Sequence, residues 1–551
     1  MSRFKGNNEL KNVLGTIPTK ERIVESRNLP DYDAKNRQGL PAYKVEDELH
    51  LLAMLNTLKL EPQFYRSESE TMKELRDLIE KIALKDPYLV AQMIVWSRCK
   101  GEGMKTINHL AATLLAPFIS GQEWGKRFYS QWNKKEQKGG CIFRLDDMSE
   151  ILGAFSSLNK SKLTNAMKKG FASVLENVDS YQILKYKKTA YDVMNLCHPN
   201  SKNSLATVKL ESGEIVKTLD AIKKGLSISA DTWESAQSEA GQIVAKAKKE
   251  GKITEEEAEI MLEKTKSDNW DQLLTEGKLG ILAALRNIRS ILKVCNDRKI
   301  IDKLCKLLSD EDAILKGKIM PYQIDTAYQI LRDEFSGWQF KSKIELALLE
   351  GYESSIPNLK KALPGKTCVM IDCSGSMHSY CTSNGHSRIN ATAVEKAGLI
   401  AATIAKSCDC DIVRFGSTAE YAKYNSKKNV FELAEELSRA NMGGTSINAA
   451  FNLITKDNKK YDRIIILSDN ECNTRSRWGR GWTEQSYQEY IRKVASPYVY
   501  CIDFAAYGTV PLKNDGKVNY YFGYGYSMFN DISSKEFNPE AHLNEVKKIV
   551  I

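Results

Sequence analysis

The chain has 551 residues, of which 42% are hydrophobic, and a formal net charge of +10. This length exceeds one ordinary core, so we expect two or more domains. The basic balance either favours a polyanionic partner such as nucleic acid or serves only solubility. The first residues hold no apolar signal core, and the longest apolar stretches, such as 110–119, are too short to span a bilayer. The 12 cysteines follow no disulfide framework or zinc spacing, so we expect a cytoplasmic protein without a membrane partner.

The first two-thirds of the chain are predicted to be helical. Residues 1–45 are polar and contain Pro and Gly, and we expect them to form an arm that packs on the rest. Over 46–357 apolar residues recur every three or four positions, with breaks such as Lys85-Asp86-Pro87. This pattern predicts antiparallel helices joined by short turns, of the HEAT-like kind that stacks into a curved solenoid. The expected helices include 49–58, 72–83, 87–97, 107–119, 148–158, 163–174, 180–184, 279–294, 322–335 and 340–352.

The hydrophobic period changes after residue 366, which predicts a second domain over 358–551. Short β-prone runs alternate there with helical stretches, as in a parallel sheet wrapped by helices. The expected strands are 367–371, 411–415, 463–467, 498–504 and 518–522, and the expected helices are 390–406, 429–440, 446–455, 484–494 and 540–550. The predicted fold class is α plus α/β, with a helical-repeat domain followed by a doubly wound parallel sheet.

Asp372, Ser374 and Ser376 form an Asp-x-Ser-x-Ser motif directly after the first expected strand. Thr445, in a Gly-Gly-Thr segment, and Asp469, after another expected strand, add two oxygen donors. Ligands of such sheets bind beyond the carboxyl ends of the strands, where these residues fall. Hydroxyl and carboxylate oxygens suit Mg²⁺ or another divalent cation. A lone Asp-x-Ser-x-Ser is more often a loop or a helix cap, but three parts in this order favour a cation site.

The motif provides a binding site and no machinery for turnover. No general base or nucleophile stands at a convincing spacing from it, so we expect no enzyme. A metal-dependent hydrolase is the most distant alternative, and His378 and His386 lie in an expected loop.

The last third of the chain resembles the von Willebrand factor A domains and their metal-ion-dependent adhesion site. In that family an Asp and two Ser, a Thr from a second loop and an Asp from a third surround the metal. An acidic group of a partner fills an open coordination position. The resemblance implies that the cation ligands are Asp372, Ser374, Ser376, Thr445 and Asp469.

Segments of the helical region resemble the TROVE domain of the Ro autoantigen family. They are Lys185-Tyr-Lys-Lys188 with Asn195-Leu-Cys-His-Pro199, 269–274 leading into 284–289, and 318–321 with Ala327. Their order, followed by the metal motif, extends the resemblance over nearly the whole chain and implies a bacterial or phage relative.

The resemblance implies a ring of HEAT-like repeats that the metal-binding domain closes. Members of the family bind small noncoding Y RNAs on the outer surface of the ring. They also take single-stranded 3′ ends of misfolded noncoding RNAs through its hole, and bacterial relatives work with exoribonucleases tethered by Y RNA. By this implication the chain is a monomeric RNA-binding ribonucleoprotein component in RNA quality control or processing.

Lys185, Lys187 and His198 match the family's RNA contacts, and Lys188 is adjacent. The chain departs from the family because it is shorter between the two parts and lacks the usual Arg after the first Lys. On the residues alone, lysines around Tyr186 at a helix end can neutralise phosphates, or simply form a solvated helix end. His198 alone is more often a turn histidine.

Two other segments combine basic and aromatic residues. Residues 127–144 interleave them in a way that suits single-stranded RNA, or form an ordinary amphipathic helix and loop. Residues 473–483 hold three Arg and two Trp, and are either a partner or RNA contact or a surface loop. The alternative to an RNA-binding function is a metal-dependent protein-interaction scaffold with no RNA role.

Overall fold

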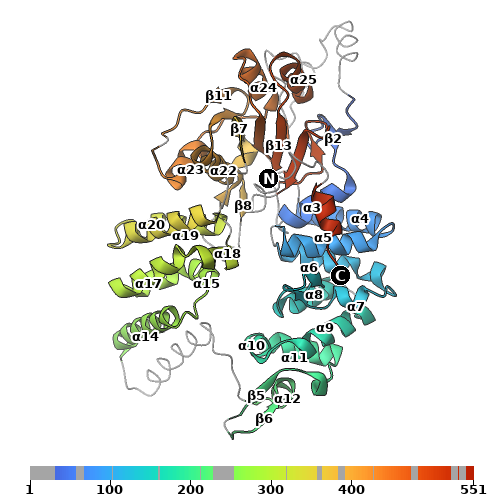
Figure 1. The fold of residues 1–551 in the computed structure, drawn as a ribbon, viewed down its shortest axis with the longest axis vertical. Helices are drawn as coiled ribbons and strands as arrows, with labels where there is room; N and C mark the ends of the chain where they lie inside the picture. The colour runs from blue at the N-terminus through green and yellow to red at the C-terminus, as the bar shows by residue number, and fades with distance from the viewer. Residues whose placement is uncertain are drawn as a thin grey trace, which may run out of the picture.

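The structure is a computed structural model of the chain. Figure 1 shows a sheet domain with two stacks of helices below it, one on each side of the view. The described residues are 31–57, 67–101, 104–158, 162–210, 212–226, 254–317, 319, 321–355, 363–382, 391–425, 427–472, 482–522, 532 and 541–551.

The central sheet has six strands within the described ranges, in the order β11-β10-β7-β12-β13-β15. They are β7 (Thr367–Asp372), β10 (Cys410–Phe415), β11 (Ala419–Tyr421), β12 (Arg463–Ser468), β13 (Tyr498–Asp503) and β15 (Val518–Phe522). Neighbouring strands are parallel except β11, which pairs antiparallel with β10 at one edge. The five expected strands are confirmed to within one residue at each end, whereas the three-residue edge strand β11 was not predicted.

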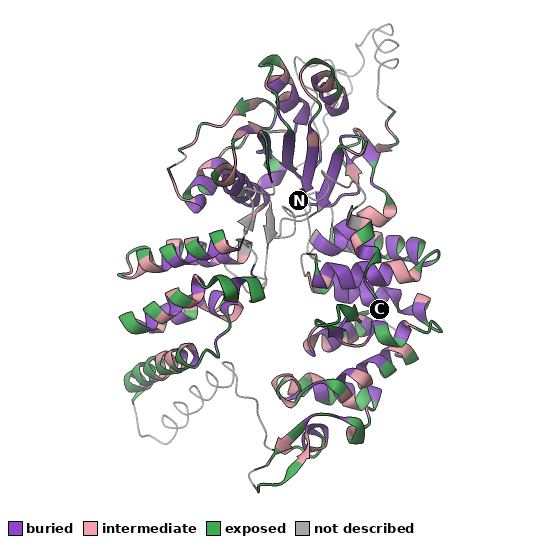
Figure 2. Cartoon of the chain, in the orientation of Figure 1, coloured by how far each residue is buried: buried purple, intermediate pink, exposed green. Residues whose placement is uncertain are grey.

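Helices cover both faces of this sheet, and the alternating side chains of β7 pack against the helices on each face. Val369 and Ile371 belong to one core cluster with α22 (Ala393–Ser407) and α23 (Val430–Ser438). Cys368 and Met370 belong to another with α24 (Ile447–Lys456) and α25 (Thr483–Lys493). Because successive strand residues point to opposite faces, a continuously apolar strand is buried on both sides. Figure 2 shows these central strands in the buried colour.

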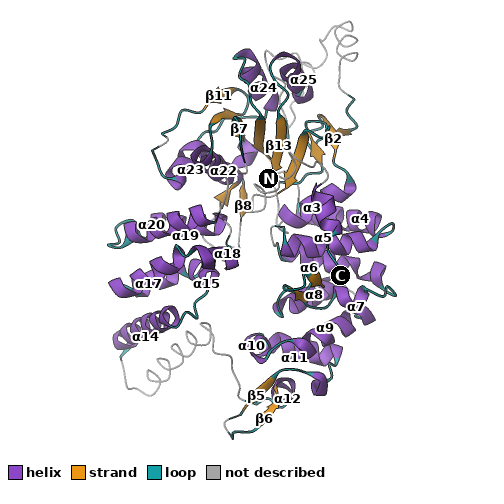
Figure 3. Ribbon diagram, viewed as in Figure 1, coloured by secondary structure: helices purple, strands orange, loops and turns teal. Residues whose placement is uncertain are grey.

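The first stack of helices has a core of its own. Asp86 accepts a hydrogen bond from the amide of Leu89 (2.9 Å), and Pro87 stands at the first helical position, so the predicted break starts a helix. The helices are α3 (Asp47–Thr57), α4 (Glu68–Ala83), α5 (Pro87–Cys99), α6 (Thr106–Leu115), α7 (Gly125–Phe128), α8 (Asp146–Ser157), α9 (Asn165–Asn177), α10 (Ser180–Lys185), α11 (Lys187–Cys197) and α12 (Thr218–Lys223). Two hairpins interrupt the stack, β3 (Trp132–Asn133) with β4 (Lys138–Gly139) and β5 (Thr207–Lys209) with β6 (Ile215–Lys217) (Figure 3).

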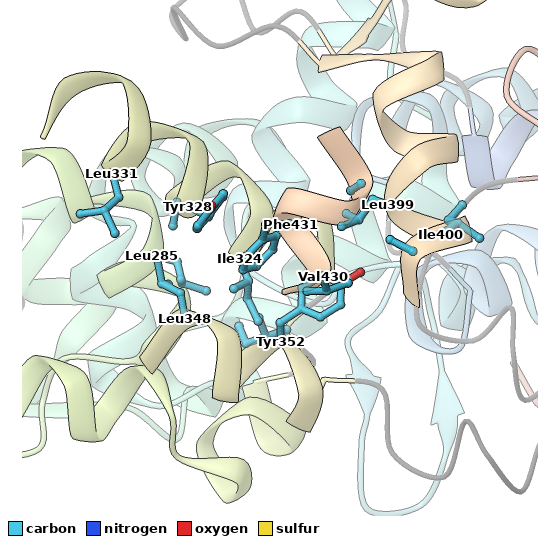
Figure 4. Packing of buried hydrophobic residues seen from close by; sticks show 14 of the residues in the cluster. Leu285, Ile324, Tyr328, Leu331, Leu348, Tyr352, Leu399, Ile400, Val430 and Phe431 are labelled. Carbon is cyan, nitrogen blue, oxygen red and sulfur yellow. The ribbon is translucent and has the colours of Figure 1, made fainter. Parts of the chain in front are cut away.

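The second stack shares its core with the sheet domain. One continuous cluster runs from Trp270 through the helices of this stack into α22, α23 and the sheet. Figure 4 shows Tyr328 and Tyr352 of the stack against Phe431 of α23. The helices are α14 (Glu255–Thr275), α15 (Ile281–Arg286), α16 (Ile288–Val294), α17 (Arg298–Leu308), α18 (Glu311–Gly317), α19 (Pro321–Glu334) and α20 (Lys341–Ser354).

Both described ends of the chain lie against other parts of the molecule. The strap, residues 34–44, contains β1 (Ala34–Lys35) and β2 (Pro41–Lys44), and β2 pairs with β14 (Thr509–Val510) of the sheet domain. At the other end, α27 (Ala541–Lys547) packs on α5, and Gln92 donates to the carbonyl oxygens of Lys547 and Ile549 at 3.0 and 2.8 Å. The prediction that 540–550 covers the sheet was therefore wrong, because its apolar side completes the core of the first stack.

The predicted domain limits at 45 and 357 stay predictions, since 356–362 lie outside the described residues. None of the helices in the described part of the chain combines the length and apolar character that a bilayer crossing requires. The cysteines whose side chains the structure describes are free thiols.

Candidate metal centre and nucleic-acid surface

Asp372 is the last residue of β7 and its side chain is buried inside the rim of the sheet. One carboxylate oxygen accepts the amide of Ser374 at 2.9 Å, and the other accepts the hydroxyl of Ser468 at 2.5 Å. Ser468 ends β12, the strand beside β7, so the parallel register places these two side chains together. The fold therefore fixes the first acid of the motif from two strands at once.

The two serines of the motif lie where the chain turns back from the strand. Ser374 precedes a short 3₁₀ helix, Gly375–His378, which contains Ser376. Their hydroxyl oxygens lie 3.2 Å apart and both side chains are buried. A hydrogen bond with Ser376 also acts on Asp469, at the end of β12. Hydrogen bonds thus link Asp372, Ser374, Ser376 and Asp469 at the carboxyl ends of β7 and β12.

Thr445 comes to the same rim on a separate loop. The amide of Gly375 donates to the carbonyl of Gly443 at 2.9 Å, and the amide of Met442 donates to that of Cys373 at 2.8 Å. Gly443 has a φ of 81°, a left-handed conformation that suits glycine. These backbone contacts hold the Gly-Gly-Thr loop against the Asp-x-Ser-x-Ser turn and bury Thr445. The structure thus brings all five predicted cation ligands to one rim of the sheet.

The buried carboxyl groups at this rim have little positive charge beside them. Burial, together with the charge of Asp469, raises the pKa of Asp372 to about 7, and burial raises the pKa of Asp469. Burial also raises the pKa of Glu471 to about 8 and that of Asp503 to about 6, with Asp469 adding to both shifts. Lysine and arginine are absent from the groups of the described residues that set the pKa of Asp372 and Asp469. A buried pair of carboxylates without a basic partner calls for another positive charge.

The side chains present fit a divalent cation. Two carboxylates and three hydroxyls supply only oxygen, which Mg²⁺ prefers, and they leave room in the coordination shell for water. Across the described ranges, His, Cys, Asp and Glu do not gather in groups of three or more that could hold a metal.

Sequence reasoning missed the groups that support this rim from behind. Ser468 binds Asp372 directly, and its place beside Asp469 was the available signal. Glu471 donates its amide to Asp469 (3.2 Å), and its carboxylate accepts the amide of Arg37 in the strap (3.0 Å). Nothing in the local sequence pairs residue 37 with residue 471, because that contact depends on how the chain closes.

The predicted RNA residues lie on α10 and α11 of the first stack. The ammonium of Lys185, at the end of α10, lies 5.9 and 6.0 Å from the ring centroids of Tyr181 and Tyr186. Lys187, at the start of α11, donates to the carbonyl of Leu226 at 3.2 Å. Lys188 follows it and is exposed. The three lysines do gather at a helix junction, but two of them are engaged within the protein.

His198 lies at the other end of α11, where it caps the helix in a left-handed conformation with a φ of 49°. It lies ten positions along the helix from Lys188 and eleven from Lys187, a length of about 15 Å. The structure therefore does not bring His198 and the lysines into one cluster, although Lys187 and Lys188 lie on the helix that His198 caps.

The aromatic residues of 127–144 do not form a stacking platform. Phe128, Tyr129 and Trp132 are buried in the core of the first stack, where Trp132 stacks on Phe143 at 5.8 Å between ring centroids. For these rings the alternative interpretation, an ordinary helix and loop that pack on the core, is therefore correct. Of the 473–483 segment, 473–481 lie outside the described residues.

Of the two histidines near the metal motif, the structure describes His378. His378 lies on the 3₁₀ helix, with a ring nitrogen 3.1 Å from the carbonyl oxygen of Ala440. His386 lies outside the described residues.

Comparison with known proteins gives one family and one fold. Residues 366–495 match the von Willebrand factor A domain of Ro60. The crystal structure of the Ro (Rsr) protein of Deinococcus radiodurans is similar over 89% of this chain and 99% of that one, with a TM-score of 0.52 and 13% identity. At that identity the likeness shows the fold.

Other comparisons contribute nothing further. The structure of an aerotolerance-related membrane protein from Bacteroides fragilis, with multiple mutations to serine, gives a TM-score of 0.19 at 12% identity. It covers 33% of this chain and 96% of that one, and carries no argument. None of the curated proteins matched the sequence.

Proposed function

We propose an RNA-binding function on the premise that the chain is a Ro-type protein, with a Ro60-type von Willebrand factor A domain and the overall fold of a bacterial Ro protein. The observation that carries this proposal is that the matched domain and the overall fold occur together in one chain. The likeness in fold extends beyond the matched domain, because it covers 89% of this chain and 99% of the Deinococcus protein. The net charge of +10 supports a polyanionic partner.

The RNA would be a small structured noncoding RNA of the Y type, together with single-stranded 3′ ends of misfolded noncoding RNA. This role belongs to RNA quality control or processing in the cytoplasm. An exoribonuclease tethered through the RNA is the expected protein partner of a monomeric chain. The exposed Lys188 and His198 on α11 support this surface of the first stack as a place of contact.

We also propose that the rim of the sheet binds Mg²⁺ or another divalent cation. The ligands would be Asp372, Ser374, Ser376, Thr445 and Asp469. A bound cation would neutralise the buried acids and offer an open position to an acidic group. The residues themselves hold the loops of the rim together by the hydrogen bonds described above.

The RNA proposal is tested by binding of a structured RNA with an unpaired 3′ tail across a series of salt concentrations. We expect affinity to fall steeply with salt, because lysine contacts to phosphates release counterions. RNA that copurifies and is released by salt would agree. A protein that shows no salt-dependent binding would instead be the metal-dependent scaffold without an RNA role.

The cation proposal is tested by calorimetric titration of the full chain with Mg²⁺ or Mn²⁺. We expect one binding event that Asp372→Ala abolishes, and an unchanged event in the variant would refute the site. A nuclease assay with Mg²⁺ on the same two proteins separates binding from hydrolysis. Cleavage that disappears in Asp372→Ala would favour the hydrolase alternative.

A further inference from the structure

Helix α11 presents an exposed stripe, and Lys188 is the one residue of it to which a role has been assigned above. Its exposed positions are Lys188, Tyr191, Asp192, Asn195 and Leu196, at the three- and four-residue spacing of one helix face. Tyr191 is 48% exposed and Leu196 is 46% exposed. Within the described part of the chain, the ring of Tyr191 contacts no other aromatic ring and no cation.

The opposite face of α11 fixes the direction of this stripe. Ala190, Val193 and Cys197 are buried in the core of the first stack. Tyr186 alone separates α10 from α11, so the two helices are joined without a flexible loop. The stripe is therefore a surface with a defined orientation and not one side of a loosely attached helix.

Both ends of the stripe carry a group that can meet phosphate. Lys188 lies in the first turn of α11, where a positive charge opposes the helix dipole and an anion is favoured. His198 is exposed just past the last turn. Ten residues of helix, about 15 Å, separate the two. That distance matches about four nucleotides at a stacking rise of about 3.4 Å.

The middle of the stripe has a different chemistry from its ends. Asp192 disfavours a phosphate there, whereas its carboxylate and the amide of Asn195 can hydrogen-bond the edges of bases. Tyr191 offers a flat face beside them, and an aromatic ring of this kind stacks with any unpaired base. The stripe therefore has groups that suit phosphates at its two ends and groups that suit bases between them. A single strand of RNA that lies along the helix can contact both kinds of group.

We propose that Tyr191 stacks with an unpaired base of a single-stranded RNA segment that runs along α11 from Lys188 to His198. This inference rests on the proposed RNA-binding function and adds to it the place and the mode of contact. It assigns Lys188 and His198 to the RNA backbone, while Lys185 and Lys187 keep the protein contacts described above.

The experiment measures affinity and its salt dependence for the full chain with a structured RNA that carries an unpaired tail. Tyr191→Ala is expected to weaken binding about tenfold, within a range of about 5- to 100-fold, and to leave the salt slope unchanged. Tyr191→Phe keeps the ring and should restore the affinity. Lys188→Ala should instead reduce the slope by about 0.7, the share of one phosphate of a single strand.

Leu346→Ala, at an apolar side chain of α20 that is 56% exposed, is the matched control. Thermal unfolding should be the same for all four variants, because these side chains lie at the surface. If the wild-type chain binds RNA and Tyr191→Ala binds within twofold of it, the inference is wrong and the function stands. If the wild-type chain binds no RNA, both fail. Loss of a protein partner with intact RNA binding would make the stripe a protein interface and overturn the inference.

Discussion

The two stacks of helices join the sheet domain in different ways. The second stack has no separate core, because its apolar residues continue into α22, α23 and the sheet. Tyr328 of α19 stacks on Phe431 of α23 at 4.1 Å between ring centroids, and Tyr352 of α20 meets the same ring edge-on at 5.2 Å (Figure 4). The buried ammonium of Lys396 pairs with Asp325 across this junction at 3.3 Å.

The first stack meets the sheet domain through polar groups and a smaller apolar contact, in which Leu49 of α3 packs on the core of the sheet domain and Ala506 lies in the core of the first stack. Arg37 of the strap contacts Glu74 of α4 at 3.1 Å, and its guanidinium lies 5.2 Å from the ring centroid of Tyr507. His50 of α3 lies between Glu74 and the carbonyl of Ala506. A cleft of about 530 Å³ opens between these groups. Charged contacts beside water contribute little each, so this junction is the weaker one.

This difference indicates where the molecule is cooperative. Residues that share one core unfold together, whereas a stack with its own core can open separately. The second stack and the sheet therefore form one unit, and the first stack forms another that carries α11. The strap and the C-terminal residues 541–551 tie the second unit to the first.

Phe431→Ala should have the largest effect. Removing a buried ring should lower the free energy of unfolding by about 3–5 kcal/mol. Hydrogen exchange should increase together in α19, α20 and α22, with α5 and α8 protected as before. Leu346→Ala is the control, since its side chain is exposed. An increase confined to α19 and α20 would show that the shared core is not one unit.

Asp147→Ala should destabilise the first stack alone. Asp147 is buried, accepts two hydrogen bonds from Arg98 at 2.8 and 3.0 Å, and lies 2.8 Å from a ring nitrogen of His109. Its loss leaves both partners buried without their acceptor, at a cost of about 3–5 kcal/mol. Exchange should increase in α5, α6 and α8. Glu150→Ala, an exposed carboxyl on the same helix, should change little.

Acid should weaken the first stack through the same residue. Burial alone would raise the pKa of Asp147, but the hydrogen bond from His109 and the charge of Arg98 hold it at about 2, below its ordinary 3.8. A depressed folded pKa gives stability that is present above pH 4 and is lost as pH falls towards 2. The loss is about 2 kcal/mol. Denaturant titrations between pH 5 and 2 should show it, and Asp147→Ala should show a shallower decline.

Arg37→Ala should have the smallest effect on stability, at most about 1 kcal/mol, because its ion pair is partly exposed. The change should appear as faster exchange in residues 34–44 and should fade with salt. Arg439→Ala, which removes an exposed ion pair within the sheet domain, is the matched control. A cost as large as that of Phe431→Ala would mean that the polar junction is as strong as the apolar one.

The local sequence was sufficient to predict features that depend on a single strand or a single helix. Continuous apolar runs predicted the sheet, and the residues just past them gave Asp372 and Asp469 a common rim. The local sequence was insufficient to predict the packing of a segment that could pack against either of two parts of the molecule, or against a ligand. Residues 540–550 have an apolar side that suits either a sheet or a helix stack, and the rings at 128–132 suit either a core or a base.

By itself the sequence determined the five long strands of the sheet and the chemistry at the carboxyl ends of β7 and β12, because periodicity and strand ends are local properties. Only the tertiary structure decided which lysines remain exposed on α11, that His198 lies a helix length away from them, and that Arg37 contacts Glu471. The exposure of a lysine depends on what packs against its helix, and the Arg37–Glu471 contact joins residues far apart in the chain. These features depend on how the helix stacks and the sheet domain pack together, and no local sequence pattern specifies that packing.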